Sequence, residues 1–89
     1  MRAVITVVGK DTVGILARVS TLCATYKINV EEVTQSILRD MFAMIMMVDI
    51  QNSEIPFTDF AEQLEDMGKS MNLSIHAMHE DIFNAMHTI

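Results

Sequence analysis

An apolar run near the start of the chain ends at a glycine and passes through a short polar bend into a helical pattern. The run covers residues 3–8 and stops at Gly9, and a second glycine, Gly14, precedes the helical spacing. This arrangement predicts a strand that leads into the N-terminus of a helix through a turn with little side-chain bulk. Backbone N–H groups at such a turn face solvent or a ligand, with the positive end of the helix dipole behind them. The bend can therefore hold a carboxylate or another small anion.

Strand and helix patterns alternate along the rest of the chain. The expected first half is a strand over residues 2–8, a helix from an N-cap at Asp11 or Thr12 to about Lys27, and a strand over 29–39 with a bulge at Glu31-Glu32. A reversal at Arg39-Asp40 then leads into a strand over 41–51. The expected second half is a helix from Pro56 to Met71, a strand over 73–79 and a short helix over 81–89.

The order strand, helix, strand, strand, helix, strand closes most simply as a four-stranded antiparallel sheet. Right-handed crossovers place both long helices on the same face of that sheet. The predicted fold is thus an α+β, ferredoxin-like βαββαβ sandwich with a short C-terminal helix. No linker or low-complexity stretch divides residues 1–89, so we expect a single domain.

The segment Met41–Gln51 is apolar on both of its alternating sides. One set is Phe42, Met44, Met46, Val48 and Ile50, and the other is Met41, Ala43, Ile45 and Met47. If both helices cover one face of the sheet, the apolar residues on the other face of Met41–Gln51 lack a cover, and Val4 and Val8 add to that surface. A large exposed apolar patch on a small domain marks an interface. We therefore expect the C-terminal helix to cover part of this surface and a second copy of the chain to cover the rest, in a homodimer.

Composition excludes several classes of function. The chain has 89 residues, with six basic and twelve acidic side chains and a net charge of −6, and its Lys and Arg residues are scattered singly. Nucleic-acid binding needs a basic footprint that this pattern lacks. No apolar run approaches the ~18 residues of a membrane span, and no signal peptide is visible. Cys23 is the only cysteine, which rules out an internal disulfide and favours a cytoplasmic location.

The residues of the first bend carry a resemblance to a known family. The segment Gly9-Lys10-Asp11-Thr12-Val13-Gly14-Ile15-Leu16-Ala17, followed by Asn29-Val30 at the next strand, resembles the ACT domain. ACT domains are small regulatory modules, often found on enzymes of amino-acid metabolism. Val13 stands where the family usually has proline, and Gly14 is kept. The tail over residues 79–87 is similar to that of small stand-alone bacterial ACT proteins.

This resemblance implies a site for an amino acid between paired domains. By position, the ligand-binding residues are Asp11, Thr12, Val13, Gly14, Ile15 and Asn29. The N–H groups of Gly14 and Ile15 would take the carboxylate, and Asp11 would pair with the ammonium group. Asn29 offers a donor and an acceptor. Gly9 supplies no side chain where several ligand-binding members have a polar residue.

Structural interpretations of the same residues stay open. Asp11 and Thr12 are ordinary helix N-cap residues, and Gly14 could serve only for close helix–strand packing. Asn29 could satisfy the C-terminus of the first helix. In the tail, His79, Glu80, Asp81 and His87 could converge on Zn²⁺, but helix-dipole preferences account for the acidic and basic positions there more simply, so no metal site is expected.

The function expected first is a regulatory binding module, a dimer that senses an amino acid and passes the information to a protein partner. The alternative is an interaction or oligomerisation module without a ligand. A small enzyme is the third class, for which His76 on the last strand is the candidate residue. No Ser-His-Asp order, phosphate-binding loop or dinucleotide fingerprint is present, so neither catalytic residues nor a cofactor are expected.

Overall fold

The computed structural model of the chain describes residues 1–10 and 14–86. Within this part of the chain the elements are β1 (Arg2–Gly9), α1 (Ile15–Thr25), β2 (Asn29–Leu38), β3 (Met41–Asp49), α2 (Phe57–Ser70), β4 (Ser74–His79) and α3 (Glu80–Met86).

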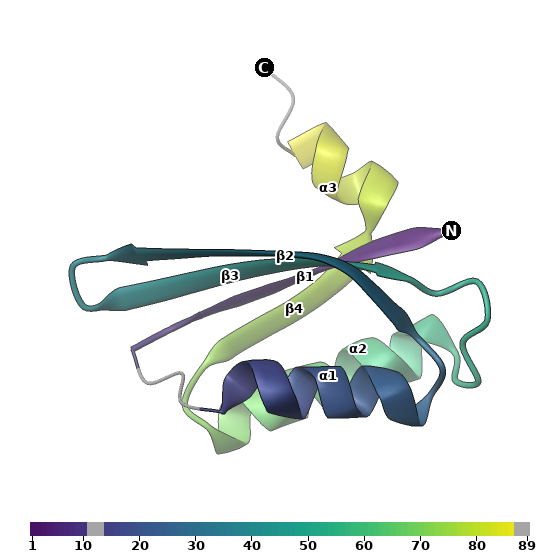
Figure 1. Ribbon diagram of the computed structural model, residues 1–89, viewed down its shortest axis with the longest axis horizontal. Coiled ribbons are helices and arrows are strands. Elements are labelled where there is room, and N and C mark those ends of the chain that lie inside the picture. The colour runs from purple at the N-terminus through teal and green to yellow at the C-terminus, as the bar shows by residue number, and fades with distance from the viewer. Residues whose placement is uncertain (11–13, 87–89) are drawn as a thin grey trace.

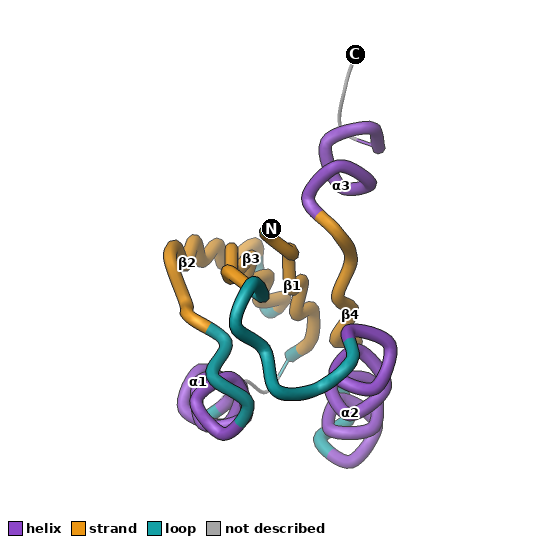
Figure 2. Tube along the Cα trace, turned by 90° about the vertical axis from the view of Figure 1, so that its right-hand side faces the viewer, coloured by secondary structure: helices purple, strands orange, loops and turns teal. Residues whose placement is uncertain are grey.

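The four strands form one antiparallel sheet in the order β2-β3-β1-β4. Helices α1 and α2 lie side by side under one face of this sheet, while α3 rises from the opposite face (Figure 1). The view along the helices shows the same two layers, with α1 below β2 and α2 below β4 (Figure 2). The predicted ferredoxin-like sandwich is confirmed.

The core lies between the sheet and the two long helices. Strand β3 contributes Met44, Met46 and Val48, which are at most 1% exposed, so the first of its two apolar sets faces the helices. Helix α2 contributes Phe60 and Leu64, both fully buried. Burial of this contiguous cluster is what holds the two layers together.

The first helix begins later than the sequence pattern predicts. Its N-cap is Gly14, in the left-handed region at φ 77°, and no side chain caps it. Asp11 and Thr12, the predicted caps, lie outside the described residues. Among the residues that are described, Gly14 is in the cap position, so the expected start near Asp11 or Thr12 is corrected to Ile15.

Asn29 does not cap the C-terminus of helix α1. Lys27 adopts a left-handed conformation at φ 59°, and the N–H of Ile28 donates to the carbonyl oxygen of Cys23 at 2.8 Å. The N–H of Lys27 donates to the carbonyl oxygen of Ala24, which completes a Schellman-type ending. The interpretation of Asn29 as a helix C-cap is therefore wrong; this residue opens β2 instead.

The remaining element boundaries are close to prediction. The register of β2 against β3 shifts between Val30 and Glu32, which confirms the predicted bulge. Strands β2, β3 and β4 are each one or two residues shorter than expected, and α3 begins at Glu80.

The face of the sheet opposite α1 and α2 is only partly covered. Helix α3 contacts β1 and β4 on this face, and Val4 is fully buried although it is not part of the core cluster between the sheet and the long helices. The expectation that Val4 adds to an open surface is thus wrong, because α3 covers its end of the sheet. Val8, Met41 and Ile45 remain about 40% exposed, as predicted: 42%, 39% and 39%.

No helix in the described part of the chain has the length and apolar character needed to span a membrane.

Candidate functional site

The N-terminus of α1 is an uncapped helix end. Within the described residues, no side chain caps it, and its first turn carries no acidic residue. At this end the N–H of Arg18 donates to the carbonyl oxygen of Gly14, at 3.0 Å. Because the earlier N–H groups of an α-helix have no intrahelical acceptor, this end presents donors and positive dipole charge to an anion.

Gly14 leaves the approach to this helix end open. A Cβ added at this position would meet nothing within 4 Å. Close helix–strand packing therefore does not explain the glycine, and the backbone does: at φ 77° a side chain would be strained. Ile15 packs its side chain into the core at 2% exposure, so it can offer a ligand only its backbone.

The other side of the bend rests on the turn between α2 and β4. Leu73 lies against Gly9 so closely that a Cβ there would meet Leu73 Cδ2. Next to this contact is an open cavity of about 580 Å³, whose lining includes Lys10, Lys69 and Asn72.

Asn29 lies at the opposite end of the domain from the bend. In the sheet register Asn29 and Arg2 both pair with Asp49, whereas Gly9 pairs with Phe42. Gly9 lies seven residue steps from Arg2 along β1, which is roughly 23 Å of extended chain. One protomer therefore does not bring Asn29 to the bend. Of the other expected site residues, Gly14 and Ile15 are at the bend, and Asp11, Thr12 and Val13 lie outside the described residues.

A family model of the ACT domain matches residues 2–78. The chain belongs to the ACT-domain family. The match covers three strands, both long helices and all but the last residue of β4, so the resemblance of the first bend extends to the whole sandwich.

Relatives of this ACT domain are matched along their whole length. The chain is 44% identical over 89 residues to a UPF0237 protein of Listeria monocytogenes, covering all of both chains. It is 38% identical over 88 residues to a UPF0237 protein of Methanopyrus kandleri, covering 99% of this chain and 98% of the relative. Among solved structures, an ACT domain protein from Streptococcus pneumoniae is 32% identical, with a TM-score of 0.79 and coverage of 100% of this chain and 97% of the other.

Sequence reasoning missed the contribution of the α2–β4 turn to the bend of this ACT domain. Lys69, Asn72 and Ser74 line the cavity beside Gly9 and Lys10, although they are some sixty residues away in sequence. The signal that could have found them is the strand order, since β1 and β4 are neighbours in this fold and Val8 pairs with Ser74.

His76 and His79 of this ACT domain contact different residues. His79 stacks on Phe57 of α2 with ring centroids 4.4 Å apart, whereas His76 Nδ1 lies 3.9 Å from Glu65 Oε1. Within residues 1–10 and 14–86, no three His, Cys, Asp or Glu side chains gather as metal ligands. His87, the fourth residue of the tail set, lies outside the described residues.

Cys23 is packed in the core of this ACT domain and is fully buried. Burial raises the pKa of its thiol to about 11, because the thiolate would lose its hydration. The sequence interpretation of this residue as buried and inert agrees with this environment.

Proposed function

We propose that this ACT domain is a cytoplasmic regulatory module that binds a small molecule, an amino acid, and acts as a dimer rather than as an enzyme. The observation that carries the proposal is the uncapped N-terminus of α1 behind the open Gly14. Membership of a family of regulatory domains supports it.

The ligand carboxylate is placed on the backbone N–H groups of Gly14 and Ile15. Backbone donors and the helix dipole act together on an anion there. Thr12 and Val13 belong to the same proposed cradle by position, and Asp11 is the partner for the ligand ammonium group. An amino acid satisfies both charges at once, which a simple anion does not.

The remaining polar contact comes from Asn29 of a second protomer. Asn29 lies at the far end of its own sheet, so it reaches a bend only when two chains stand side by side. Strand β2, which carries Asn29, is an edge strand. On its helix side it exposes Val33 and Ile37, at 38% and 74%. A long edge strand offers its unpaired N–H and C=O groups to another chain, and β2 is therefore the edge at which we place the second chain.

A site shared by two chains turns ligand binding into a change of assembly. The ligand shifts the equilibrium only by the difference between its affinities for the paired and unpaired states. A protein partner that recognises one of these states would then receive the signal.

Thermal unfolding in the presence of each of the twenty amino acids tests this proposal. A ligand at a hundred times its dissociation constant stabilises the folded state by about 2.7 kcal/mol, which raises the melting temperature of a domain of this size by roughly 10 °C or more. We expect one amino acid, or a few related ones, to give such a shift. No shift with any of them would contradict the proposal.

Variants of the proposed site residues test whether the thermal shift comes from binding at the bend. Asp11→Ala and Asn29→Ala should each abolish the shift, because each removes one polar partner of the ligand. Asp66→Ala and Asn52→Ala are matched controls, since both residues are exposed and neither belongs to the bend or to β2; they should keep the full shift. A shift that survives both site variants would place the ligand elsewhere.

The second candidate is an interaction module without a ligand, which the exposed apolar face of the sheet favours. This second function is supported if no amino acid stabilises the protein and a protein partner binds to it. The affinity for that partner should then be the same in wild type, Asp11→Ala and Asn29→Ala.

A further inference from the structure

The cavity beside the first bend has no role in the contacts proposed for the carboxylate and ammonium groups of the ligand. Its volume is about 580 Å³, and its walls come from the end of β1, the start of β3 and the turn between α2 and β4. The end of β1, the start of α1 and the α2–β4 turn all lie at one end of the domain (Figure 1). An amino acid held at the bend by its α-carboxylate and ammonium groups can therefore extend its side chain into this cavity.

The wall formed by the α2–β4 turn is fixed by its own backbone. Asn72 adopts a left-handed conformation at φ 59°, and the N–H of Leu73 donates to the carbonyl oxygen of Gly68 at 2.8 Å, as in a Schellman ending. The N–H of Asn72 donates to the carbonyl oxygen of Lys69 at 3.3 Å. These bonds occupy carbonyl groups at the end of α2 that would otherwise present negative dipole charge to a ligand. The end of α2 is thus no obstacle to an anion in the cavity.

The polar groups on the cavity wall suit an anion. Within the described residues, the charged side chains of the lining are Lys10 and Lys69, and Asn72 and Ser74 add an amide and a hydroxyl. The side chains of Lys69, Asn72 and Ser74 make no hydrogen bond or ion pair with another described residue. Lys10 lies 3.6 Å from Asp40, but the two side chains are 74% and 73% exposed, so this pair contributes little. Both lysines are therefore available to a ligand.

The rest of the cavity wall is apolar. It is formed by Val8, Met41, Met71 and Leu73, so the methylene groups of a ligand side chain can pack against it. A purely apolar side chain would use this part of the wall and leave the two lysines without a contact. The lining thus suits a short aliphatic stem that ends in an anionic group, which is the pattern of aspartate and glutamate.

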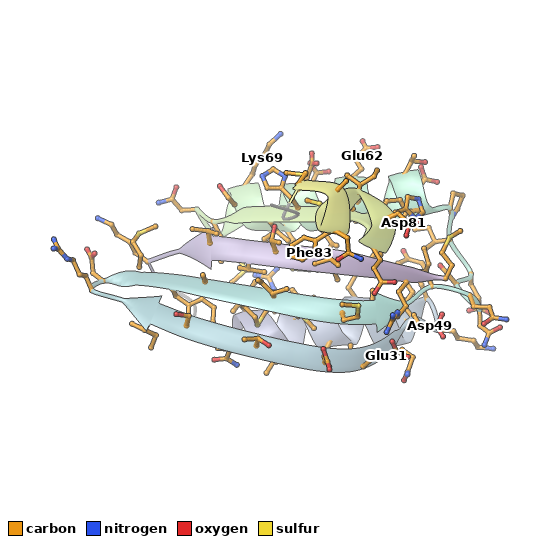
Figure 3. All side chains as sticks on the ribbon, turned by 90° about the horizontal axis from the view of Figure 1, so that it is seen from above. Glu31, Asp49, Glu62, Lys69, Asp81 and Phe83 are labelled. Atoms are coloured by element: carbon orange, nitrogen blue, oxygen red, sulfur yellow. The ribbon has the colours of Figure 1, made fainter. Side chains whose placement is uncertain are left out.

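Charge is distributed unevenly between the two ends of the domain. Lys69 lies toward the bend end of the sheet, whereas the opposite end carries Glu31, Asp49 and Asp81 (Figure 3). The turn that contains Arg39 is also at the bend end, because Phe42 pairs with Gly9 on one side and with Ile37 on the other. In a chain of net charge −6, this separation favours the approach of an anion at the bend end over any other part of the surface.

We propose that the ligand of this ACT domain is an acidic amino acid whose side-chain carboxylate enters the cavity and is bound by Lys10 and Lys69. This inference rests on the proposed function, since the bend must hold the other two charged groups of the ligand. The cavity then selects among amino acids. Glutamine and asparagine keep every contact at the bend but lose the attraction of the two lysines, and a cationic side chain is repelled by them.

Calorimetric titration with matched amino acids tests the selection. L-Glutamate is compared with L-glutamine, and L-aspartate with L-asparagine, at neutral pH and constant ionic strength, because salt screens exposed charges. We expect the acidic member of at least one pair to bind about tenfold more tightly than its amide. One exposed lysine–carboxylate pair changes affinity by up to about fivefold, and the cavity wall offers two lysines.

Variants of the two lysines test the predicted contact. Lys69→Met should weaken binding of the acidic amino acid by up to about fivefold and leave binding of its amide unchanged. The double variant Lys10→Met/Lys69→Met should bind both equally. Arg2→Met is the matched control, because it removes one exposed positive charge at the α3 end of the sheet; it should keep the full preference. The unfolding temperature of each variant without ligand establishes that it is folded.

Failure of this inference and failure of the proposed function give different results. If the amides bind as tightly as the acids, or a neutral amino acid binds most tightly, the acidic ligand is wrong and the proposed function stands. A preference for the acid that survives in Lys10→Met/Lys69→Met also overturns the inference, because the side-chain carboxylate must then lie outside the cavity. If no amino acid binds, the proposed function fails and the inference fails with it.

Discussion

At the scale of single residues, the bend depends on backbone conformation more than on side-chain contacts. Gly14 has room for a side chain but holds φ at 77°, so glycine is needed there for its conformational freedom. Gly9 differs, because Leu73 occupies the space that a side chain would need. The sequence shows both glycines equally, and only the structure separates their roles.

Gly14→Ala should destabilise the domain by about 1 to 2 kcal/mol, the cost of an L-residue in the left-handed region. Gly14→Asn should cost less, since Asn tolerates this conformation better. Urea unfolding of the three proteins measures the difference. Equal stability of Gly14→Ala and wild type would mean that the bend relaxes to negative φ.

Cys23 should make the domain less stable in alkali. Its thiol pKa rises from 9.0 to about 11 on folding, because of burial, so the unfolded chain releases the proton first. The stabilising contribution is complete below pH 9 and is lost as the pH rises through about 11, by roughly 2 to 3 kcal/mol in all.

The measurement compares urea unfolding of wild type and Cys23→Ala between pH 8 and pH 11. Other groups titrate in both proteins, so the difference isolates the thiol. We expect the free energy of unfolding of wild type to fall relative to that of Cys23→Ala as the pH rises. A difference in the free energy of unfolding that stays constant across this range would contradict a buried, protonated thiol.

At the scale of elements, the order and the alternation of the strands could be predicted, whereas the start of α1 and the burial of Val4 could not. The period of each apolar pattern is a property of its own segment, so the βαββαβ order and the two alternating apolar sets of residues 41–51 follow from sequence. The structure shows that the set with Met44, Met46 and Val48 faces the helices. The start of α1 was misplaced because two good capping residues precede Gly14. Val4 was misplaced because its burial depends on where α3 lies, which no local pattern encodes.

The position of α3 should depend on Arg2. Arg2→Met removes the pairs with Glu80 and Glu31 but keeps an aliphatic side chain. Because Arg2 is half exposed, the loss should be no more than about 1 kcal/mol. We expect the amide hydrogens of Phe83 and Asn84 to exchange up to about fivefold faster, with little change in overall stability.

Lys27→Met is the control for this variant, because it removes another exposed ion pair, with Glu54, at a distance from α3. Its exchange rates in α3 should equal those of wild type. Unchanged exchange in Arg2→Met would show that the packing of Phe83 alone positions the helix.

At the scale of the whole molecule, two surfaces could contact a second chain. The edge strand β2 carries Asn29 and exposed apolar side chains, and the face of the sheet opposite α1 and α2 exposes Val8, Met41 and Ile45. The candidate site could be predicted from sequence only as two separate halves, the bend and Asn29. Their separation along the sheet is what makes the proposed ligand site a property of two protomers.

Complementation between Asp11→Ala and Asn29→Ala chains tests this central claim most directly. A ligand identified by thermal shift is titrated calorimetrically into each variant and into an equimolar mixture refolded together. If the site joins the bend of one chain to Asn29 of the other, each variant alone should bind nothing. In random mixed pairs, one of the two sites then has both residues intact, so about a quarter of all sites should recover wild-type affinity. Binding by either variant alone, or none in the mixture, would contradict a site shared between two chains.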